Sequence, residues 1–376
     1  MENRSQLGAS HRIVIKIGSS SLAYATGKLN LGGIDLLVRQ IADLHNEGRQ
    51  VLLVTSGAIG AGAGKLGLGR RPRSIPEKQA AAAVGQGLLM HVYEKFFAEY
   101  GVTVGQVLVA REDFADRKRF INMRNTLCAL LRFGVLPVIN ENDTVAVDEI
   151  KMGDNDYLSA LVAGLVNADV LLLLSDVDGL YTGDPGRDPA ARLIPSVREI
   201  TPEVEALGGG SGSDLGTGGM ATKLAAARMA MQSGVITVIA RAHAREVIRR
   251  VLGGEEVGTV FWPAENKLEA RKRWIAYGSA VAGSVKVDEG AARALIKQGK
   301  SLLPSGVIGV EGRFGVGDTV SIVDPQGREI ARGIVNFTAA EIEKIKGVNT
   351  GDIAAILGPR SYEEVVHRNN MVLEIR

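Results

Sequence analysis

Short apolar runs alternate with longer stretches of helical apolar spacing over residues 12–252 of this 376-residue chain. The short runs predict strands at residues 12–17, 51–55, 102–110, 135–139, 170–174 and 235–240. The longer stretches predict helices at residues 34–46, 77–100, 117–133, 156–167, 219–233 and 244–252. Strands that are apolar throughout and separated by helices are typical of a parallel sheet buried on both faces. The expected fold class is therefore α/β, a three-layer αβα sandwich around a mostly parallel sheet.

The pattern changes at residues 262–275, where Pro263 is followed by a polar run and then by three basic residues. Strand-like segments dominate beyond this point, at residues 283–287, 306–311, 319–323 and 329–336, with helical stretches at 289–298 and 339–345. Such a change of composition is typical of a domain boundary. The predicted division is an α/β domain at 8–262, a linker at 263–280 and a small β-rich domain at 281–370.

Composition excludes several classes of protein. Lys and Arg number 44 against 42 Asp and Glu, and aromatic residues make up 5% of the chain, which argues against nucleic acid as the main partner. The single cysteine, Cys128, excludes an intrachain disulfide and suits a reducing compartment. Residues 1–10 are polar, and the longest aliphatic run, 170–174, is too short to cross a bilayer. We therefore expect a cytoplasmic protein with no membrane partner.

Glycine-rich clusters occur at residues 16–20, 55–60 and 216–223, close to predicted strand or helix ends. Open α/β sheets bind ligands at the carboxyl ends of their strands. Bare backbone N–H groups at a helix N-terminus, with a lysine nearby, bind phosphate. Each cluster alone is explained by a tight turn, but three of them, two with a lysine, favour a phosphate site.

Two familiar nucleotide-binding motifs do not fit the chain. A Walker A loop needs glycine six positions before its lysine, where Lys65 has Ile59 and Lys223 has Thr217. Residues 62–67 have the G-x-G-x-x-G spacing, but they begin several residues past a strand and no acid follows at the required distance. A nicotinamide cofactor is therefore a weak alternative.

Asn, Asp and Glu side chains concentrate in two short segments, 140–143 and 154–156, the first at the end of a predicted strand. Turn chemistry is the simpler explanation, since Asn and Asp are common in turns. Against it, so many polar groups beside a buried strand end are expensive unless they bind something small and polar. Their mixture of amides and acids suits the ammonium and carboxylate groups of an amino acid. Asp176, after another strand, could face a nucleotide or a magnesium ion.

Five ordered motifs resemble those of the glutamate 5-kinases, which are members of the amino acid kinase family. They lie at residues 16–20, 54–59, 140–143, 153–156 and 216–223. Residues 289–291 and 301–306 are similar to the PUA domain that bacterial glutamate 5-kinases often carry. The resemblance covers essentially the whole chain. One departure is Ser175, where many relatives have Thr, and it keeps the hydroxyl group.

The resemblance implies ATP-dependent phosphorylation of the L-glutamate γ-carboxylate to γ-glutamyl 5-phosphate, the first step of L-proline biosynthesis. A free Glu carboxyl group has a pKa near about 4.3, so the acceptor is already ionised at neutral pH and needs no general base. The resemblance also implies ATP as co-substrate, with Mg²⁺ held chiefly by phosphates and water rather than by a protein metal site. L-proline as a feedback inhibitor and a homo-dimer or homo-tetramer are further expectations.

The resemblance assigns roles to individual residues. The catalytic residues implied are Lys16 and Lys223, which would contact the phosphates from two sides, and Asp156, which would hold both lysines. The glutamate-binding residues implied are Ser56, Gly57, Ala58, Asn140, Asp143 and Asn155. The ATP-binding residues implied are Lys16, Ser175, Asp176, Thr217, Gly218, Gly219, Met220, Ala221, Thr222 and Lys223.

Three alternatives stay open on the sequence. A sister kinase acting on aspartate, N-acetylglutamate or a nucleotide would share the glycine clusters but lack the paired segments 140–143 and 153–156 as a set. An NADP-dependent oxidoreductase would need a proper fingerprint loop after a strand. An RNA-binding protein is suggested only by the PUA-like tail, in which basic and acidic residues balance over 276–376.

Overall fold

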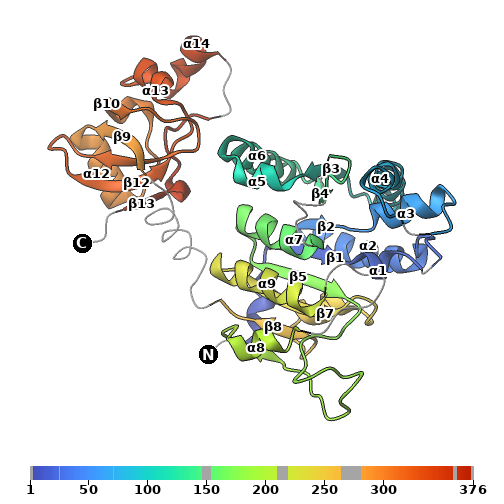
Figure 1. Cartoon of the computed structure of the whole chain (residues 1–376). Helices are drawn as coiled ribbons and strands as arrows, with labels where there is room; N and C mark the ends of the chain where they lie inside the picture. Colours follow the sequence, from blue (N-terminus) through green and yellow to red (C-terminus); the bar gives the residue numbers. More distant parts are fainter. Residues whose placement is uncertain are drawn as a thin grey trace. The chain divides into compact units, whose positions relative to one another are not determined.

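The computed structural model describes residues 3–24, 26–70, 72–145, 154–209, 219–263, 281–358 and 362–373. The chain divides into two compact units, Met1–Asp116 with Asn122–Lys267, and Leu268–Arg376 with Arg117–Ile121. Figure 1 labels their helices and strands. Apart from Pro263, the predicted linker lies outside the described residues, so its boundaries stay a prediction.

An eight-stranded sheet forms the first unit, in the order β3-β4-β2-β1-β5-β7-β8-β6. Its strands are β1 (Arg12–Ile17), β2 (Gln50–Val54), β3 (Val104–Val109), β4 (Leu136–Glu141), β5 (Val170–Ser175), β6 (Ser196–Val197), β7 (Ile236–Arg241) and β8 (Thr259–Phe261). The neighbours from β3 to β7 are all parallel, whereas β8 runs antiparallel to β7 and pairs with β6. The prediction of a mostly parallel sheet is confirmed.

Helices connect the strands of this unit. They are α1 (Ser19–Leu22), α2 (Leu31–Asn46), α3 (Ala58–Lys65), α4 (Ile75–Ala98), α5 (Arg111–Ala115), α6 (Arg117–Arg132), α7 (Asp154–Leu165), α8 (Pro202–Ala206), α9 (Met220–Gln232) and α10 (Val247–Leu252). Local signals begin two of them: Asn30 accepts a hydrogen bond from Gly33 N before α2, and Ser74 accepts one from Glu77 N before α4. None of the helices in the described ranges has the length and hydropathy of a bilayer-spanning segment.

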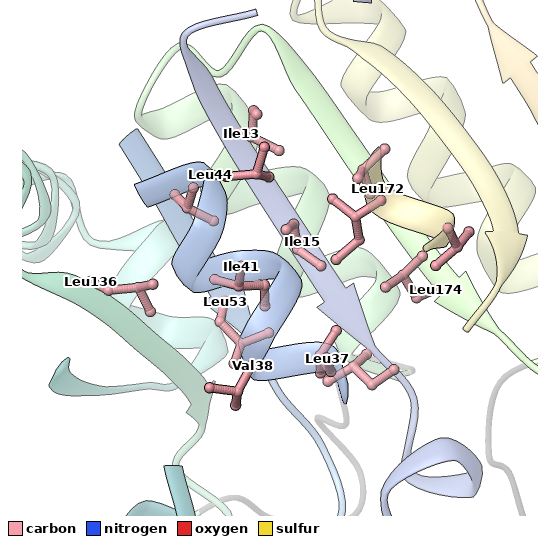
Figure 2. Close-up of a cluster of buried hydrophobic side chains, with 14 of the residues drawn as sticks. Ile13, Ile15, Leu37, Val38, Ile41, Leu44, Leu53, Leu136, Leu172 and Leu174 are labelled. Carbon is pink, nitrogen blue, oxygen red and sulfur yellow. The ribbon is translucent and has the colours of Figure 1, made fainter. Parts of the chain in front are cut away.

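The core on one face of the sheet lies under α2. Figure 2 shows the α2 side chains Leu37, Val38, Ile41 and Leu44 among side chains of four neighbouring strands, Ile13, Ile15, Leu53, Leu136, Leu172 and Leu174. Successive side chains of a strand point to opposite faces. Because Ile13 and Ile15 face α2, Lys16 of β1 points to the other face. Helices α7 and α9, which pack against each other and against β1, β5 and β7, lie there.

Helices α3 and α4 pack with their backbones in contact. A Cβ atom at Gly62 would lie 1.7 Å from the carbonyl oxygen of Ala81, and one at Gly85 would lie 1.8 Å from that of Ala58. Only hydrogen atoms fit into such an approach, so both positions need glycine. This contact locks α3, the helix that begins directly after the Thr55–Gly57 turn, onto the long helix α4.

The second unit, orange to red in Figure 1, is built on a five-stranded sheet in the order β10-β9-β11-β12-β13. Its strands are β9 (Val281–Val287), β10 (Val307–Gly312), β11 (Thr319–Val323), β12 (Glu329–Ile334) and β13 (Met371–Leu373), and its helices are α12 (Glu289–Gln298), α13 (Ala339–Ile345) and α14 (Ile353–Leu357). It has its own apolar core, which includes Val285, Ile322 and Ile342. The prediction of a small β-rich C-terminal domain is confirmed.

Candidate active site

The strand order reverses at β1, since β2, β4 and β3 follow on one side and β5 and β7 on the other. Ligands of open α/β sheets bind at such a switch point, beyond the carboxyl ends of the strands. The residues at these ends are Lys16 in β1, Thr55 and Ser56 after β2, Asn140 in β4 and Ser175 in β5. Most of them were expected in the site from the sequence, and the sheet topology accounts for their proximity.

A buried carboxylate holds two buried lysines at this edge. Lys16 Nζ lies 2.6 Å from Asp156 Oδ1, and Lys223 Nζ lies 3.1 Å from Asp156 Oδ2. The exposed fraction of the side chain is 2% for Lys16, 6% for Lys223 and 0% for Asp156. Three separate elements supply them, because Lys16 lies in β1, Asp156 in the first turn of α7 and Lys223 in the first turn of α9. We call this group the lysine–aspartate cluster.

Charge in this cluster is unbalanced. Burial of the Asp156 carboxyl group raises its pKa, but the charges of Lys16 and Lys223 and their hydrogen bonds outweigh burial and hold the pKa below its ordinary value. Asp156 is therefore ionised near neutral pH, and within this cluster one carboxylate is shared by two lysine side chains. A buried net positive charge is expensive unless an anion joins it. The cluster is thus suited to bind an anionic group such as a phosphate.

The N-terminus of α9 lies beside this cluster. Gly219 precedes the helix without a side-chain cap, and the Thr222 hydroxyl donates to Asp156 Oδ2 at 3.2 Å. Uncapped backbone N–H groups at a helix N-terminus, together with the positive end of its dipole, favour an anion. Because Lys223 belongs to the same turn, the helix end and the lysine act on the same region.

Amide side chains form a second, neutral group beside the first. Asn155, adjacent to Asp156 in α7, donates from Nδ2 to Ser56 Oγ at 3.0 Å and to Asn140 Oδ1 at 2.8 Å. It also donates to the carbonyl oxygen of Thr55. Asn140 donates in turn from Nδ2 to Gln86 Oε1 at 2.7 Å. We call Ser56, Asn140, Asn155 and Gln86 the amide cluster. All four are at least nine-tenths buried.

Helix α4 contributes two residues that sequence reasoning missed. Gln86 ends the row of amides, and the Tyr93 hydroxyl lies 2.8 Å from Thr55 Oγ1 behind the site. Full burial raises the pKa of Tyr93, so its hydroxyl stays protonated. The available signal was a glutamine within the buried stripe of α4, which also contains Ala82, Leu89 and Tyr93. Nothing in the sequence connects that glutamine with Asn140.

The other predicted residues have varied positions. Gly57 has φ of 91°, in the left-handed region, and caps α3, whose first residue is the buried Ala58. Asp143 is half-buried just after β4. Ser175 donates to Asp176 Oδ1 at 2.9 Å at the end of β5, and Asp176 is exposed. Gly219, Met220 and Ala221 lie at the start of α9. Thr217 and Gly218 lie outside the described residues.

The structure thus brings two sets of predicted residues together. Lys16, Thr222 and Lys223 all contact Asp156, and Ser56 and Asn140 both accept hydrogen bonds from Asn155. The two sets meet at Asn155 and Asp156, which are consecutive. The Ile17–Leu174 pairing of β1 with β5 places Ser175 and Asp176 one strand away from Lys16.

Comparison with known proteins identifies both units. The model of the amino acid kinase family matches residues 11–241, and that of the PUA domain matches residues 283–357. The chain is 59% identical over 372 residues to the glutamate 5-kinase of Moorella thermoacetica, covering 99% of this chain and 98% of that protein. It is 56% identical over 362 residues to the glutamate 5-kinase of Caldanaerobacter subterraneus, covering 96% and 97%.

A solved structure supports the fold. The carbamate kinase from Giardia lamblia bound to AMP-PNP matches with a TM-score of 0.50 and 18% identity, covering 68% of this chain and 99% of that chain. At this identity the match bears on the fold alone. The family matches and the near full-length relatives show that the chain belongs to the amino acid kinase family, in its glutamate 5-kinase branch with a C-terminal PUA domain.

Proposed function

We propose that this chain transfers the terminal phosphoryl group of ATP to the γ-carboxylate of L-glutamate, giving γ-glutamyl 5-phosphate, the first step of L-proline biosynthesis. The observation that carries the proposal is the lysine–aspartate cluster, a buried site with excess positive charge directly beside a neutral amide cluster. The two glutamate 5-kinases that match over nearly their whole length support the same activity.

The residues of the cluster supply electrostatic stabilisation rather than proton transfer. The acceptor carboxylate is ionised at neutral pH, because a free Glu side chain has a pKa near about 4.3. Catalysis then requires that two anions meet and that charge on the moving phosphoryl group is stabilised. Lys16 and Lys223 are positioned for this, since Asp156 fixes both ammonium groups and neutralises only one of them. The backbone N–H groups at the start of α9 would stabilise the same negative charge.

Recognition of glutamate falls to the amide cluster and Asp143. Each hydrogen bond that the structure gives the Asn155 side chain uses Nδ2, which leaves its Oδ1 as an acceptor for a ligand. An amide oxygen and the Asp143 carboxylate are suited to an α-ammonium group. Gly57 and Ala58 start α3, and their backbone N–H groups are available to a carboxylate.

We assign the nucleotide to the carboxyl end of β5 and the N-terminus of α9. Ser175, Asp176 and the segment from Thr217 to Lys223 would line the ATP site. Mg²⁺ would accompany the nucleotide and neutralise part of the charge on its phosphates. Both Asp156 oxygens are taken by lysines, and the described residues contain no cluster of three or more His, Cys, Asp or Glu side chains that could hold a metal. We expect the ion to be held by phosphates and water, and Asp176 is an exposed carboxylate at the end of β5.

An acceptor screen tests the proposal. ADP release with ATP and Mg²⁺ is measured for glutamate, aspartate, N-acetylglutamate and UMP, and the acyl phosphate is trapped with hydroxylamine as a hydroxamate. We expect activity and trapping with glutamate alone. A preference for any other acceptor, or ADP release without a trappable product, would overturn the assignment. L-proline added to the same assay, and light scattering of the purified chain, test the further expectations of feedback inhibition and of a dimer or tetramer.

A further inference from the structure

Gln86 has an unusual hydrogen-bonding state for a buried amide. Its side chain lies in α4 with 8% of its surface exposed, and Oε1 accepts from Asn140 Nδ2 at 2.7 Å. Its Nε2, in contrast, has no hydrogen-bond partner among the described residues. Buried polar groups are almost always paired, so an unpaired one requires a reason.

The direction of the hydrogen bonds provides that reason. An amide side chain has nearly the same shape when its oxygen and nitrogen are exchanged, so neighbouring groups must fix which end points where. Asn140 Oδ1 accepts from Asn155 Nδ2 at 2.8 Å and from Glu141 N at 2.9 Å, which commits Asn140 Nδ2 to the opposite side. Gln86 meets that group with its oxygen. If the Gln86 amide were turned over, two N–H donors would face each other.

The row of amides therefore has one direction, from Asn155 through Asn140 to Gln86. Gln86 stabilises this direction at its far end, because its oxygen binds the nitrogen of Asn140 in the orientation in which the Asn140 oxygen accepts from Asn155 and from Glu141 N. Asn155 then uses Nδ2 within the protein and keeps Oδ1 for a ligand. An oxygen recognises an ammonium group, whereas a nitrogen in its place would repel one.

We propose that Gln86 is a positioning residue that stabilises the direction of these amides and so supports recognition of an acceptor with a free amino group. The inference rests on the proposed function, in that the acceptor is an amino acid. Gln86 acts through Asn140 and Asn155, and its unpaired Nε2 is the cost of holding Oε1 toward Asn140.

Kinetics of Gln86→Met test this, because methionine has a similar length and lacks both amide atoms. Loss of one buried hydrogen bond in the row should raise the KM for glutamate about tenfold and leave the KM for ATP within about twofold. Gln86→Glu keeps an oxygen that accepts from Asn140 in either protonation state, so its KM for glutamate should stay within about threefold of the wild type.

A matched control is Gln40→Met in α2. Gln40 Oε1 also accepts a hydrogen bond, from Ile248 N at 3.1 Å, but that contact lies on the α2 face of the sheet. This variant should lower Tm without changing either KM. In a double variant with Asn140→Ala, Gln86→Met should add little to the effect of Asn140→Ala alone, because the two side chains act in series.

Three results would overturn the proposal: an unchanged KM for glutamate in Gln86→Met, equal rises in both KM values, or full additivity with Asn140→Ala. If Gln86→Met does not fold, Gln86→Ala is measured in its place, and failure of both variants to fold would make Gln86 a structural residue. The wild-type chain separates this inference from the proposed function. If wild-type protein phosphorylates glutamate and Gln86→Met is normal, only the role of Gln86 is wrong.

Discussion

Asn155 and Asp156 are neighbours in the first turn of α7, yet they belong to clusters of opposite character. Asp156 joins two lysines in a group with excess positive charge, whereas Asn155 joins Ser56, Asn140 and Gln86 in a group without charge. The first suits a phosphoryl group, whose charge changes during transfer, and the second suits a substrate that must be recognised by shape and hydrogen-bond direction. Under the proposed function, one helix turn therefore contributes to both catalysis and recognition, and variants of Asp156 and of Asn155 should impair the enzyme in different ways.

The largest effect is expected from Asp156→Asn. Two buried lysines would then lose the charge of Asp156, and breaking a buried ion pair in this way costs about 3–5 kcal/mol of unfolding free energy. The rate should fall more than about 10³-fold, since neither ammonium group would be held in place. Steady-state ADP release and urea unfolding measure both effects. Asp35→Asn, an exposed change in α2, is the control, and a kcat within about tenfold of wild type in Asp156→Asn would contradict the division.

The pH dependence of unfolding tests the same residue independently. The folded pKa of Asp156 lies below its ordinary value. Ionised Asp156 therefore stabilises the protein at pH values above the pKa of an Asp side chain in the unfolded chain, which is about 3.9. That contribution is lost as the pH falls through the folded pKa. The stability difference between wild type and Asp156→Asn should therefore stay constant from neutral pH down to about 4 and shrink only below it. A difference that disappears between pH 7 and pH 5 would show that Asp156 is not ionised as described.

Lys223→Ala should give the next largest effect, a fall in kcat of about 10²–10³-fold with little change in glutamate affinity. In the proposed reaction, the charge of Lys223 acts on the phosphoryl group during its transfer, when negative charge is spread over the phosphoryl oxygens. Lys16→Ala should behave similarly. Lys65→Ala is the matched control, because Lys65 is exposed at the end of α3. Near-normal turnover of Lys223→Ala would exclude the start of α9 from phosphate binding.

Asn155→Ala and Asp143→Ala should weaken glutamate binding rather than turnover. Each would remove a polar contact to the substrate ammonium group, at a cost of about 1.5–3 kcal/mol, or about 10- to 100-fold in the KM for glutamate. ATP binding, measured by calorimetry, should be nearly intact in both variants. Lost ATP affinity with unchanged glutamate affinity would reverse our assignment of the two clusters.

The smallest effect is expected from removal of the C-terminal domain, the part of the second unit that follows residue 277. A chain that ends at residue 277 should still phosphorylate glutamate, because every proposed site residue precedes residue 224. Each unit has an apolar core of its own, as an independently folding domain needs. Activity and circular dichroism of the shortened chain are measured together. A folded but inactive product, or tight salt-sensitive RNA binding by the second unit, would contradict the assignment of chemistry to the first unit alone.

Much of this fold could be predicted from the sequence. The predicted strand at 12–17 has the bounds of β1, and the run at 170–174 lies within β5, because strands buried on both faces are apolar throughout. β6 and β8 were not predicted, since strands of two and three residues leave too short a pattern. α3 was not predicted either, because six of its first seven residues are small, three alanines and three glycines.

The candidate site, like the fold, could be predicted from the sequence only in part. The lysine–aspartate cluster could be predicted through motifs that resemble those of a known family, although its distances could not. The bond from Asn140 to Gln86 joins residues 54 positions apart in the chain. Whether a glutamine inside an apolar helical stripe faces a core or a site depends on which strand end packs beside it, and only the tertiary structure determines that.

The contact between Gly62 and Gly85 limits the substitutions that this chain can accept during evolution. Both glycines meet backbone carbonyl groups rather than movable side chains, so no compensating substitution nearby could make room for even one methyl group. In a saturation library selected for growth without the pathway's end product, these two positions should be as invariant as Lys16 or Asp156. These two positions would then tolerate far fewer substitutions than the exposed faces of the same helices, although neither glycine takes part in the reaction.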